Sequence, residues 1–190
     1  MKFKFYFLSL LLISLGSCTE DASIPRPRGY FRIDLPEKQY QMYSSDCPFV
    51  FEIPSYSVMS PGSAGDAQPC WLNLQFPKQK ATLHLSYKEV QNNGNQMMED
   101  SRNMAYKHAV KANGIEEKVF ENLDENVYGI MYKISGNAAS SVQFYVTDND
   151  RHFLRGSLYF YSSPNADSLQ PVTSFIREDI EHLVSTLRWK

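Results

Sequence analysis

The residue with the clearest chemical role is a cysteine at position 18, which follows a short hydrophobic segment. Leu15-Gly16-Ser17-Cys18 has the pattern of a bacterial lipobox, in which the cysteine thiol takes a diacylglycerol and the cysteine becomes the first mature residue. Lys2 and Lys4 precede an apolar run from Phe5 to Leu15, and together they form the charged start and hydrophobic segment of an export signal. We therefore predict lipidation at Cys18.

The apolar run also limits how the chain is attached to a membrane. It is about half the roughly 20 residues that a transmembrane helix needs, so a permanent span is not expected. Several acyl chains, at roughly 0.8 kcal/mol per buried methylene, would instead give a lasting anchor. We expect a signal peptide at 1–17, a lipidated N-terminus and tether at 18–28, and one domain at 29–190. The alternative is an ordinary secretory signal with an incidental cysteine.

Cys47 and Cys70 are the two remaining cysteines. Outside the cytoplasm, two thiols in a folded domain usually pair, and a disulfide closing this proline- and glycine-rich loop would contribute roughly 3 kcal/mol. A zinc site would need more ligands, and no histidine lies between the two cysteines. A redox couple would favour C-x-x-C spacing. A structural disulfide is the prediction, and two unpaired thiols are the alternative.

The histidines do not form a recognisable catalytic or metal-binding pattern. No pair has the spacing of a helical zinc site, and HExxH, G-x-S-x-G, the phosphate loop and the dinucleotide fingerprint are all missing from the sequence. The adjacent acids Glu99 and Asp100 would point in different directions on a helix. The sequence therefore predicts no catalytic residue, no metal and no cofactor; the histidines, on four different predicted elements, are His84, His108, His152 and His182.

An arginine-rich segment with aromatic residues follows the predicted tether. Its prolines favour an extended backbone. It could contact a partner protein or lipid phosphates, or it could dock Tyr30, Ile33 and Leu35 on the core while the arginines face water. The candidate partner-contact residues are Arg26, Arg28, Tyr30, Phe31 and Arg32.

The composition argues against a nucleic-acid-binding protein and against a disordered chain. Removing residues 1–17 leaves 173 of the 190 residues, enough for one domain with a sizeable core, and moves the formal charge from −2 to −4. This charge gives no reason to expect a nucleic-acid surface. Twelve tyrosines and twelve phenylalanines argue for a folded, aromatic-rich domain and against disorder.

The predicted strands fall into two groups on either side of a helix. Ala81 to Tyr87 alternates clearly, with leucines and tyrosine on one face and Thr82, His84 and Ser86 on the other, as expected in an antiparallel sheet. Asp148-Asn149-Asp150 is typical of a hairpin turn. The other predicted strands are 49–53, 71–76, 117–121, 127–135, 140–147 and 151–161.

Two helices are predicted. The first runs from about Asn95 to Ala112 and places three methionines and His108 on or near its apolar face, which we interpret as core rather than as a soft-metal surface. The second runs from about Ser168 to Arg188, with Pro171 in its first turn. On this helix, Arg177, Glu178, Asp179 and Glu181 are predicted to face water.

This order of elements predicts an α+β fold, in which one antiparallel sheet is covered by long helices. The order and the closing amphipathic helix resemble the PsbP/Mog1-like architecture. Such a fold says little about activity, because it hosts non-catalytic adaptors and accessory subunits.

Four segments of the mature chain resemble the GldD family of gliding-motility lipoproteins. They are Arg26-Pro-Arg-Gly-Tyr-Phe-Arg-Ile-Asp-Leu-Pro36, Cys70-Trp-Leu-Asn73, Lys80-Ala-Thr-Leu-His-Leu-Ser-Tyr87 and His152-Phe-Leu-Arg-Gly156. The resemblance implies a bacterium of the Bacteroidota and a link to gliding and type IX secretion. It implies no enzyme activity and transfers no ligand residues, so only Cys18 is carried over as a functional position.

The function predicted from this resemblance is that of a non-catalytic envelope lipoprotein, an assembly or stability factor for the gliding and secretion machinery. It would face the periplasm, on the outer membrane rather than the inner one, with other envelope proteins as partners and no nucleic acid. One alternative is a periplasmic binding module for a small molecule or glycan, with Trp71 or Trp189 as stacking platforms. A third is a hydrolase using His84 or His152.

Overall fold

The described part of the chain forms two antiparallel sheets and two long helices. The structure is a computed structural model that describes residues 33–62 and 68–190. The helices are α2 (Gly94–Tyr106) and α3 (Ala166–Ser185), and a 3-10 turn, η1, covers Lys107–Lys111. The strands are β1 (Tyr40–Ser44), β2 (Phe49–Pro54), β3 (Val58–Pro61), β4 (Trp71–Phe76), β5 (Ala81–Glu89), β6 (Ala112–Asn122), β7 (Val127–Gly136), β8 (Ser140–Thr147), β9 (His152–Phe160) and β10 (Arg188–Trp189).

The larger sheet has seven strands in the order β3-β4-β5-β9-β8-β7-β6. At its centre β5 pairs with β9, a strand far along the chain, from Ala81 opposite Phe160 to Glu89 opposite His152. The hairpin turn predicted at 148–150 joins β8 to β9, and Asp148 Oδ1 accepts the backbone N–H groups of Asp150, Arg151 and His152. A second sheet of three strands has the order β1-β2-β10.

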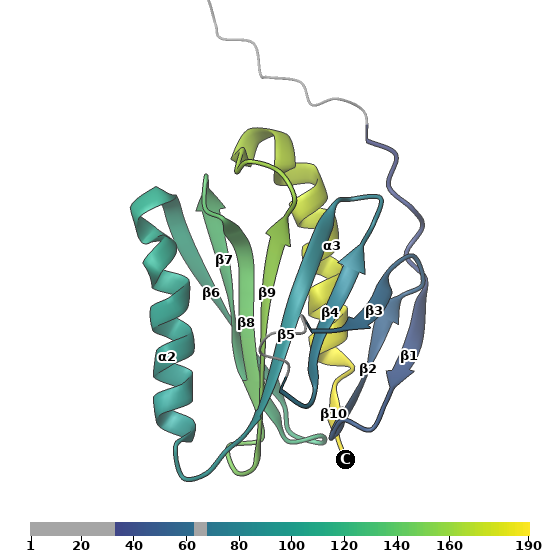
Figure 1. Ribbon diagram of the computed structural model, residues 1–190. Helices are drawn as coiled ribbons and strands as arrows, with labels where there is room; N and C mark the ends of the chain where they lie inside the picture. Colours follow the sequence, from purple (N-terminus) through teal and green to yellow (C-terminus); the bar gives the residue numbers. More distant parts are fainter. Residues whose placement is uncertain (1–32, 63–67) are drawn as a thin grey trace, which may run out of the picture. The chain divides into compact units, whose positions relative to one another are not determined.

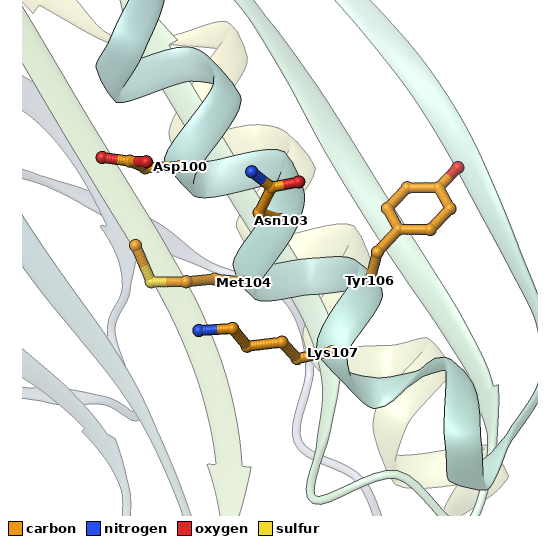
Figure 2. A pocket seen from close by; sticks show the side chains of 5 residues that line it. All are labelled: Asp100, Asn103, Met104, Tyr106 and Lys107. Atoms are coloured by element: carbon orange, nitrogen blue, oxygen red, sulfur yellow. The ribbon is translucent and has the colours of Figure 1, made fainter.

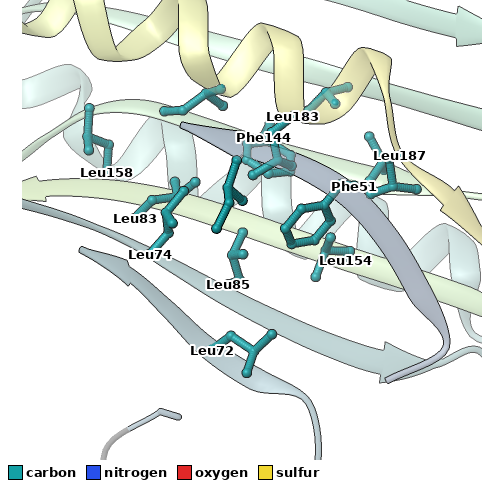
Figure 3. Packing of buried hydrophobic residues seen from close by; sticks show 14 of the residues in the cluster. Phe51, Leu72, Leu74, Leu83, Leu85, Phe144, Leu154, Leu158, Leu183 and Leu187 are labelled. Carbon is teal, nitrogen blue, oxygen red and sulfur yellow. The ribbon is translucent and has the colours of Figure 1, made fainter. Parts of the chain in front are cut away.

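The main core lies between one face of the seven-stranded sheet, the helix α3 and the small sheet (Figures 1 and 3). Alternate residues of β4, β5, β9 and β8 point into it, because successive side chains of a strand face opposite ways. Gly156 lets the Phe144 ring pack directly on the backbone of β9, because a Cβ at this position would lie 2.2 Å from the ring. The core residues labelled in Figure 3 include Leu74, Leu83, Leu85, Phe144, Leu154, Leu158 and Leu183.

The opposite face of the same sheet is covered by α2 only in part. A smaller buried cluster joins Ala105 of α2 to Tyr132, Tyr145 and Phe153, which belong to β7, β8 and β9. Met97 and Met98 pack against this cluster, whereas Met104 is 39% exposed. The methionine-rich face of α2 is therefore only partly core.

The first helix ends earlier than the sequence predicts. α2 stops at Tyr106, η1 follows, and β6 begins at Ala112, where the helix was expected to end. No residue of η1 is buried, and Val110 is 93% exposed, so no apolar contact holds this stretch as an α-helix against the sheet. His108 is consequently part-buried rather than a core residue.

The second helix differs from the prediction in two respects. It begins at Ala166, with the Asn165 side chain accepting the Ser168 N–H, so Pro171 lies beyond the first turn. Asp179, predicted to face water, is 1% exposed. The prediction of a single sheet is also wrong, because β2 pairs with two strands that were not foreseen, β1 and β10, in a second sheet; β3, at the edge of the large sheet, was not foreseen either.

Candidate functional site

The candidate site is a group of polar and aromatic side chains on the α2-facing surface of the large sheet, some of them exposed and others buried. We call it the polar strip. It crosses the centre of the sheet from β4 through β5 and β9 to β8, and its residues share one face by strand alternation and register. The polar strip consists of Trp71, Asn73, His84, Ser86, Gln143, Arg155, Ser157 and Tyr159.

Its outer half is formed by hydrogen-bonded and aromatic side chains. His84 Nδ1 lies 2.6 Å from Asn73 Oδ1, and these two residues are directly opposite each other on β5 and β4. The His84 ring meets the Tyr159 ring edge-on, with centroids 5.6 Å apart. His84 and Tyr159 are exposed, so this half is open to solvent.

The other half of the strip contains Arg155, an arginine that has no acidic partner among the described residues. Arg155 is part-buried, and its Nη2 donates to Gln143 Oε1 at 2.5 Å. No carboxylate within residues 33–62 and 68–190 forms an ion pair with it, whereas the more exposed arginines of the same region do: Arg102, Arg151 and Arg188 pair with Glu117, Asp150 and Glu125. The least solvated strand arginine is thus the uncompensated one.

A second uncompensated group lies beside this arginine. Ser157 is 3% exposed, and its Oγ has no hydrogen-bond partner among the residues that the structure describes. On the neighbouring strands His84 and Gln143 are directly opposite it. Buried polar atoms normally find a partner; Ser157 Oγ is one of six buried side-chain polar atoms that lack one among the described residues, and it lies on the same strand face as Arg155.

The surroundings of His84 in the strip, and of His108 in η1, favour the neutral form of the imidazole. Burial lowers the pKa of His84 below its ordinary value. Burial, and then the positive charge of Arg155, lower the pKa of His108 in η1. Burial also lowers the pKa of the Arg155 guanidinium, which nevertheless remains cationic at neutral pH. At pH 7 the site therefore presents one positive charge, at Arg155.

The other two histidines are held in separate structural contacts. His152 Nδ1 lies 2.8 Å from the Tyr87 hydroxyl, and the ring stacks on Trp189 at 5.1 Å. His182 Nε2 lies 2.6 Å from Glu52 Oε2, and its ring stacks on Tyr40. The structure does not bring the four histidines together, and the described residues hold no group of three or more His, Cys, Asp or Glu side chains that could bind a metal ion.

A buried carboxylate on α3 forms a second polar cluster, which is fully bonded. Asp179 Oδ1 accepts from Lys38 Nζ at 2.8 Å and from the Tyr40 hydroxyl at 2.9 Å, and Oδ2 accepts from the Tyr56 hydroxyl at 2.5 Å. Lys38 also lies 4.0 Å above the Phe175 ring. With every oxygen engaged, this cluster fastens residues 38–56 to α3 and leaves no donor for a ligand.

Of the remaining predicted site residues, the two cysteines lie within the described ranges and the others lie outside them. Cys47 and Cys70 form a disulfide, with their Cα atoms 5.5 Å apart. Cys18 and the candidate partner-contact residues Arg26, Arg28, Tyr30, Phe31 and Arg32 lie outside the described residues.

A broad hollow runs along α2. It has a volume of about 650 Å³ and is bounded by Asp100, Asn103, Met104, Tyr106 and Lys107. Figure 2 shows that Asp100, Met104 and Lys107 extend to one side of the helix and Tyr106 to the other, so the side chains diverge. Nothing in this arrangement would enclose a ligand.

Within the described ranges, neither helix has both the length and the apolar character needed to span a bilayer.

The fold places this chain with the PsbP-like α+β proteins, a class that the strand order and the closing helix had predicted. The solution structure of cyanobacterial PsbP (CyanoP) from Synechocystis sp. PCC 6803 matches it with a TM-score of 0.50 and 10% identity, covering 84% of this chain and 98% of that one. At this identity the match shows the fold alone. Curated protein sequences give no significant match.

The chain itself belongs to the family of the gliding motility lipoprotein GldD, whose profile matches residues 20–189. The predicted family and fold class are confirmed. Membership makes this a membrane-anchored envelope protein with a role in gliding motility.

Proposed function

We propose that the protein is a non-catalytic lipoprotein that acts as an assembly or stability factor of the gliding and type IX secretion machinery. The observation that carries the proposal is the family match over residues 20–189, which covers nearly all of the chain beyond the predicted signal peptide. The structural contacts of His152 and His182 add support, because each imidazole is bonded to a side chain of the fold and stacked on an aromatic ring, Trp189 for His152 and Tyr40 for His182.

The proposal includes an anchor at Cys18 and a domain that faces the periplasm, on the outer membrane rather than the inner one. The arm formed by Arg26, Arg28, Tyr30, Phe31 and Arg32 would supply a contact to other envelope proteins near the membrane. Arginine and aromatic residues are enriched among the residues that dominate binding energy at interfaces.

The test is complementation of gliding cells that lack the protein, combined with crosslinking in intact cells. Cys18→Ala should give an unlipidated precursor that folds but does not restore gliding. Replacing Arg26, Arg28 and Arg32 with serine should abolish gliding and the crosslinked partner at normal protein abundance, since surface ion pairs contribute only about 0–1 kcal/mol each to stability.

The matched control is Arg102→Ser on α2, an exposed arginine far along the chain that should leave gliding unchanged. Full gliding by the Cys18→Ala variant would contradict the lipid anchor. Full gliding by the triple arginine variant would contradict the partner contact.

A further inference from the structure

We propose that the polar strip is a binding site for a small organic carboxylate, with Arg155 as the residue that holds the charged group. This inference goes beyond the proposed function and does not depend on it. It rests on the Arg155 guanidinium, which has no ion-pair partner within residues 33–62 and 68–190, on the buried Ser157 hydroxyl beside it, which lacks a hydrogen-bond partner in the same ranges, and on the hydrogen-bonding side chains that surround both.

Arg155 has no ion-pair partner among the described residues, and this arrangement costs free energy. A part-buried cation has lost some of its hydration, and proteins normally compensate such a charge with a carboxylate and additional hydrogen bonds. Among the described residues, the guanidinium donates a hydrogen bond to the neutral Gln143 amide. A guanidinium carries five N–H donors, so enough remain for two parallel bonds to a carboxylate.

Hydrogen-bonding and aromatic side chains surround the Arg155 guanidinium. The buried Ser157 hydroxyl, two residues along β9 on the same face, lacks a hydrogen-bond partner in the described part of the chain. Directly opposite Ser157 on β5, the His84 ring is hydrogen-bonded to Asn73 and meets the Tyr159 ring edge-on. These groups offer hydrogen bonds and an aromatic edge to the uncharged part of a ligand, which is the usual composition of a small-molecule site.

The charge of the polar strip favours a ligand with a single negative charge. His84 is shifted toward the neutral form, so Arg155 carries the one positive charge among the eight residues of the polar strip; Lys88, on the same face of β5, lies beyond Ser86 and is exposed. A singly charged carboxylate balances the charge of Arg155, whereas a phosphate dianion would leave a net negative charge. A small ligand is favoured over a flat protein surface, because Arg155 is only part-exposed while its neighbours His84 and Tyr159 are exposed.

Three of the four segments that carry the family resemblance meet at this strip. Cys70-Trp-Leu-Asn73 contributes Trp71 and Asn73, the segment ending at Tyr87 contributes His84 and Ser86, and His152-Phe-Leu-Arg-Gly156 contributes Arg155. Segments far apart in the sequence are thus adjacent here because β5 pairs with both β4 and β9.

The experiment uses the full-length protein in a non-ionic detergent, labelled with ¹⁵N at its histidines. Sodium glucuronate is the carboxylate probe, glucose is its neutral match, and inorganic phosphate and sodium chloride are titrated separately. Glucuronate should shift the ring signals of His84 and His108 and saturate with a Kd on the order of 1 mM, a modest affinity expected of one charged anchor. The signals of His152 and His182 should stay in place, and glucose and chloride should have no effect.

Arg155→Gln should weaken glucuronate binding by about tenfold or more, as expected for the loss of a charged hydrogen-bond partner. Arg151→Gln, an exposed arginine four residues earlier, is the matched control and should bind as the unaltered protein does. Arg155→Lys keeps the charge but loses the fork geometry, so it should also bind more weakly and serves as the second variant if Arg155→Gln does not fold.

Absence of any glucuronate shift in the unaltered protein would overturn the proposal, and so would equal shifts with glucose. Shifts of all four histidines, or unchanged binding by Arg155→Gln, would show an effect elsewhere and would also overturn it. Tighter binding of phosphate than of glucuronate would reject the carboxylate assignment.

Discussion

Replacing the buried carboxylate of α3 should destabilise the domain strongly. Asp179 has a side chain that is 0% exposed, and it accepts hydrogen bonds from Lys38, Tyr40 and Tyr56. Asp179→Ala would remove all three bonds at once. It would also leave the ammonium of Lys38, whose side chain is 25% exposed, without its closest anion, and two tyrosine hydroxyls without an acceptor.

The magnitude follows from these contacts. Breaking a buried ion pair by removing one partner costs about 3–5 kcal/mol, because the other charge is left uncompensated. Tyr40→Phe and Tyr56→Phe each remove one donor to a charged acceptor and should cost about 1.5–3 kcal/mol. For a domain of this size, 1 kcal/mol corresponds to about 2–4 °C in Tm, so Asp179→Ala should lower Tm by about 6–20 °C.

The assay is urea unfolding of the disulfide-bonded protein, followed by tryptophan fluorescence and repeated by circular dichroism to test two-state behaviour. Glu178→Gln is the matched control. Glu178 neighbours Asp179 on the same helix and lies 3.3 Å from the same lysine, but its side chain is 59% exposed. Its replacement should cost less than about 1 kcal/mol, as exposed ion pairs do.

An Asp179→Ala variant that loses less than about 1 kcal/mol, or no more than Glu178→Gln loses, would refute this reasoning. Such a result would mean that the network compensates the desolvation of its members without fastening the N-terminal segment to the helix.

Three further predictions concern pH, the disulfide and a buried histidine. Burial, followed by hydrogen bonding to Asp179, raises the pKa of Tyr40 and Tyr56 above the ordinary value of 10.0; the corresponding stability is present below pH 10 and should be lost as pH rises above it, with a flatter alkaline decline of Tm in Tyr56→Phe. Reduction of Cys47–Cys70 should lower the free energy of unfolding by roughly 3 kcal/mol, and peptide mapping without reductant should show the two peptides linked; free thiols in freshly isolated protein would count against it. His152→Ala should cost about 2–4 kcal/mol through lost contacts with Tyr87 and Trp189, yet leave gliding intact at normal abundance; loss of gliding by a stable variant would revive a catalytic reading.

The sequence predicts the central strands well because their alternation is strong. β5 has leucines on one face and polar residues on the other, and the structure keeps this arrangement. β1 was missed because its five residues are part-buried or exposed and carry no apolar alternation, and β10 has only two residues. Asp179 was misplaced because its partners Lys38, Tyr40 and Tyr56 lie more than 120 residues away, beyond the reach of any local pattern.

The polar strip could be predicted only in part. The placement of His84 on the polar side of its strand follows from alternation alone. Arg155 carried a usable signal, since a cation stands between Phe153 and Ser157 on one face of an otherwise apolar strand. Its proximity to His84 depends on β5 pairing with β9 rather than with the next strand in sequence, which the sequence does not reveal.

The disulfide also limits how far the domain can be stretched. If a lipid at Cys18 holds the N-terminus while the machinery pulls on the domain, the load enters at residue 33 and first reaches the Lys38–Asp179 contact and then β1. Peeling this segment away would release at most about 50 Å of extended chain, residues 33–46. At Cys47 the load would pass through the covalent bond to Cys70, directly before β4, so the traction would be borne by the main sheet. The cystine would then act as a mechanical stop that keeps the central strands folded under tension.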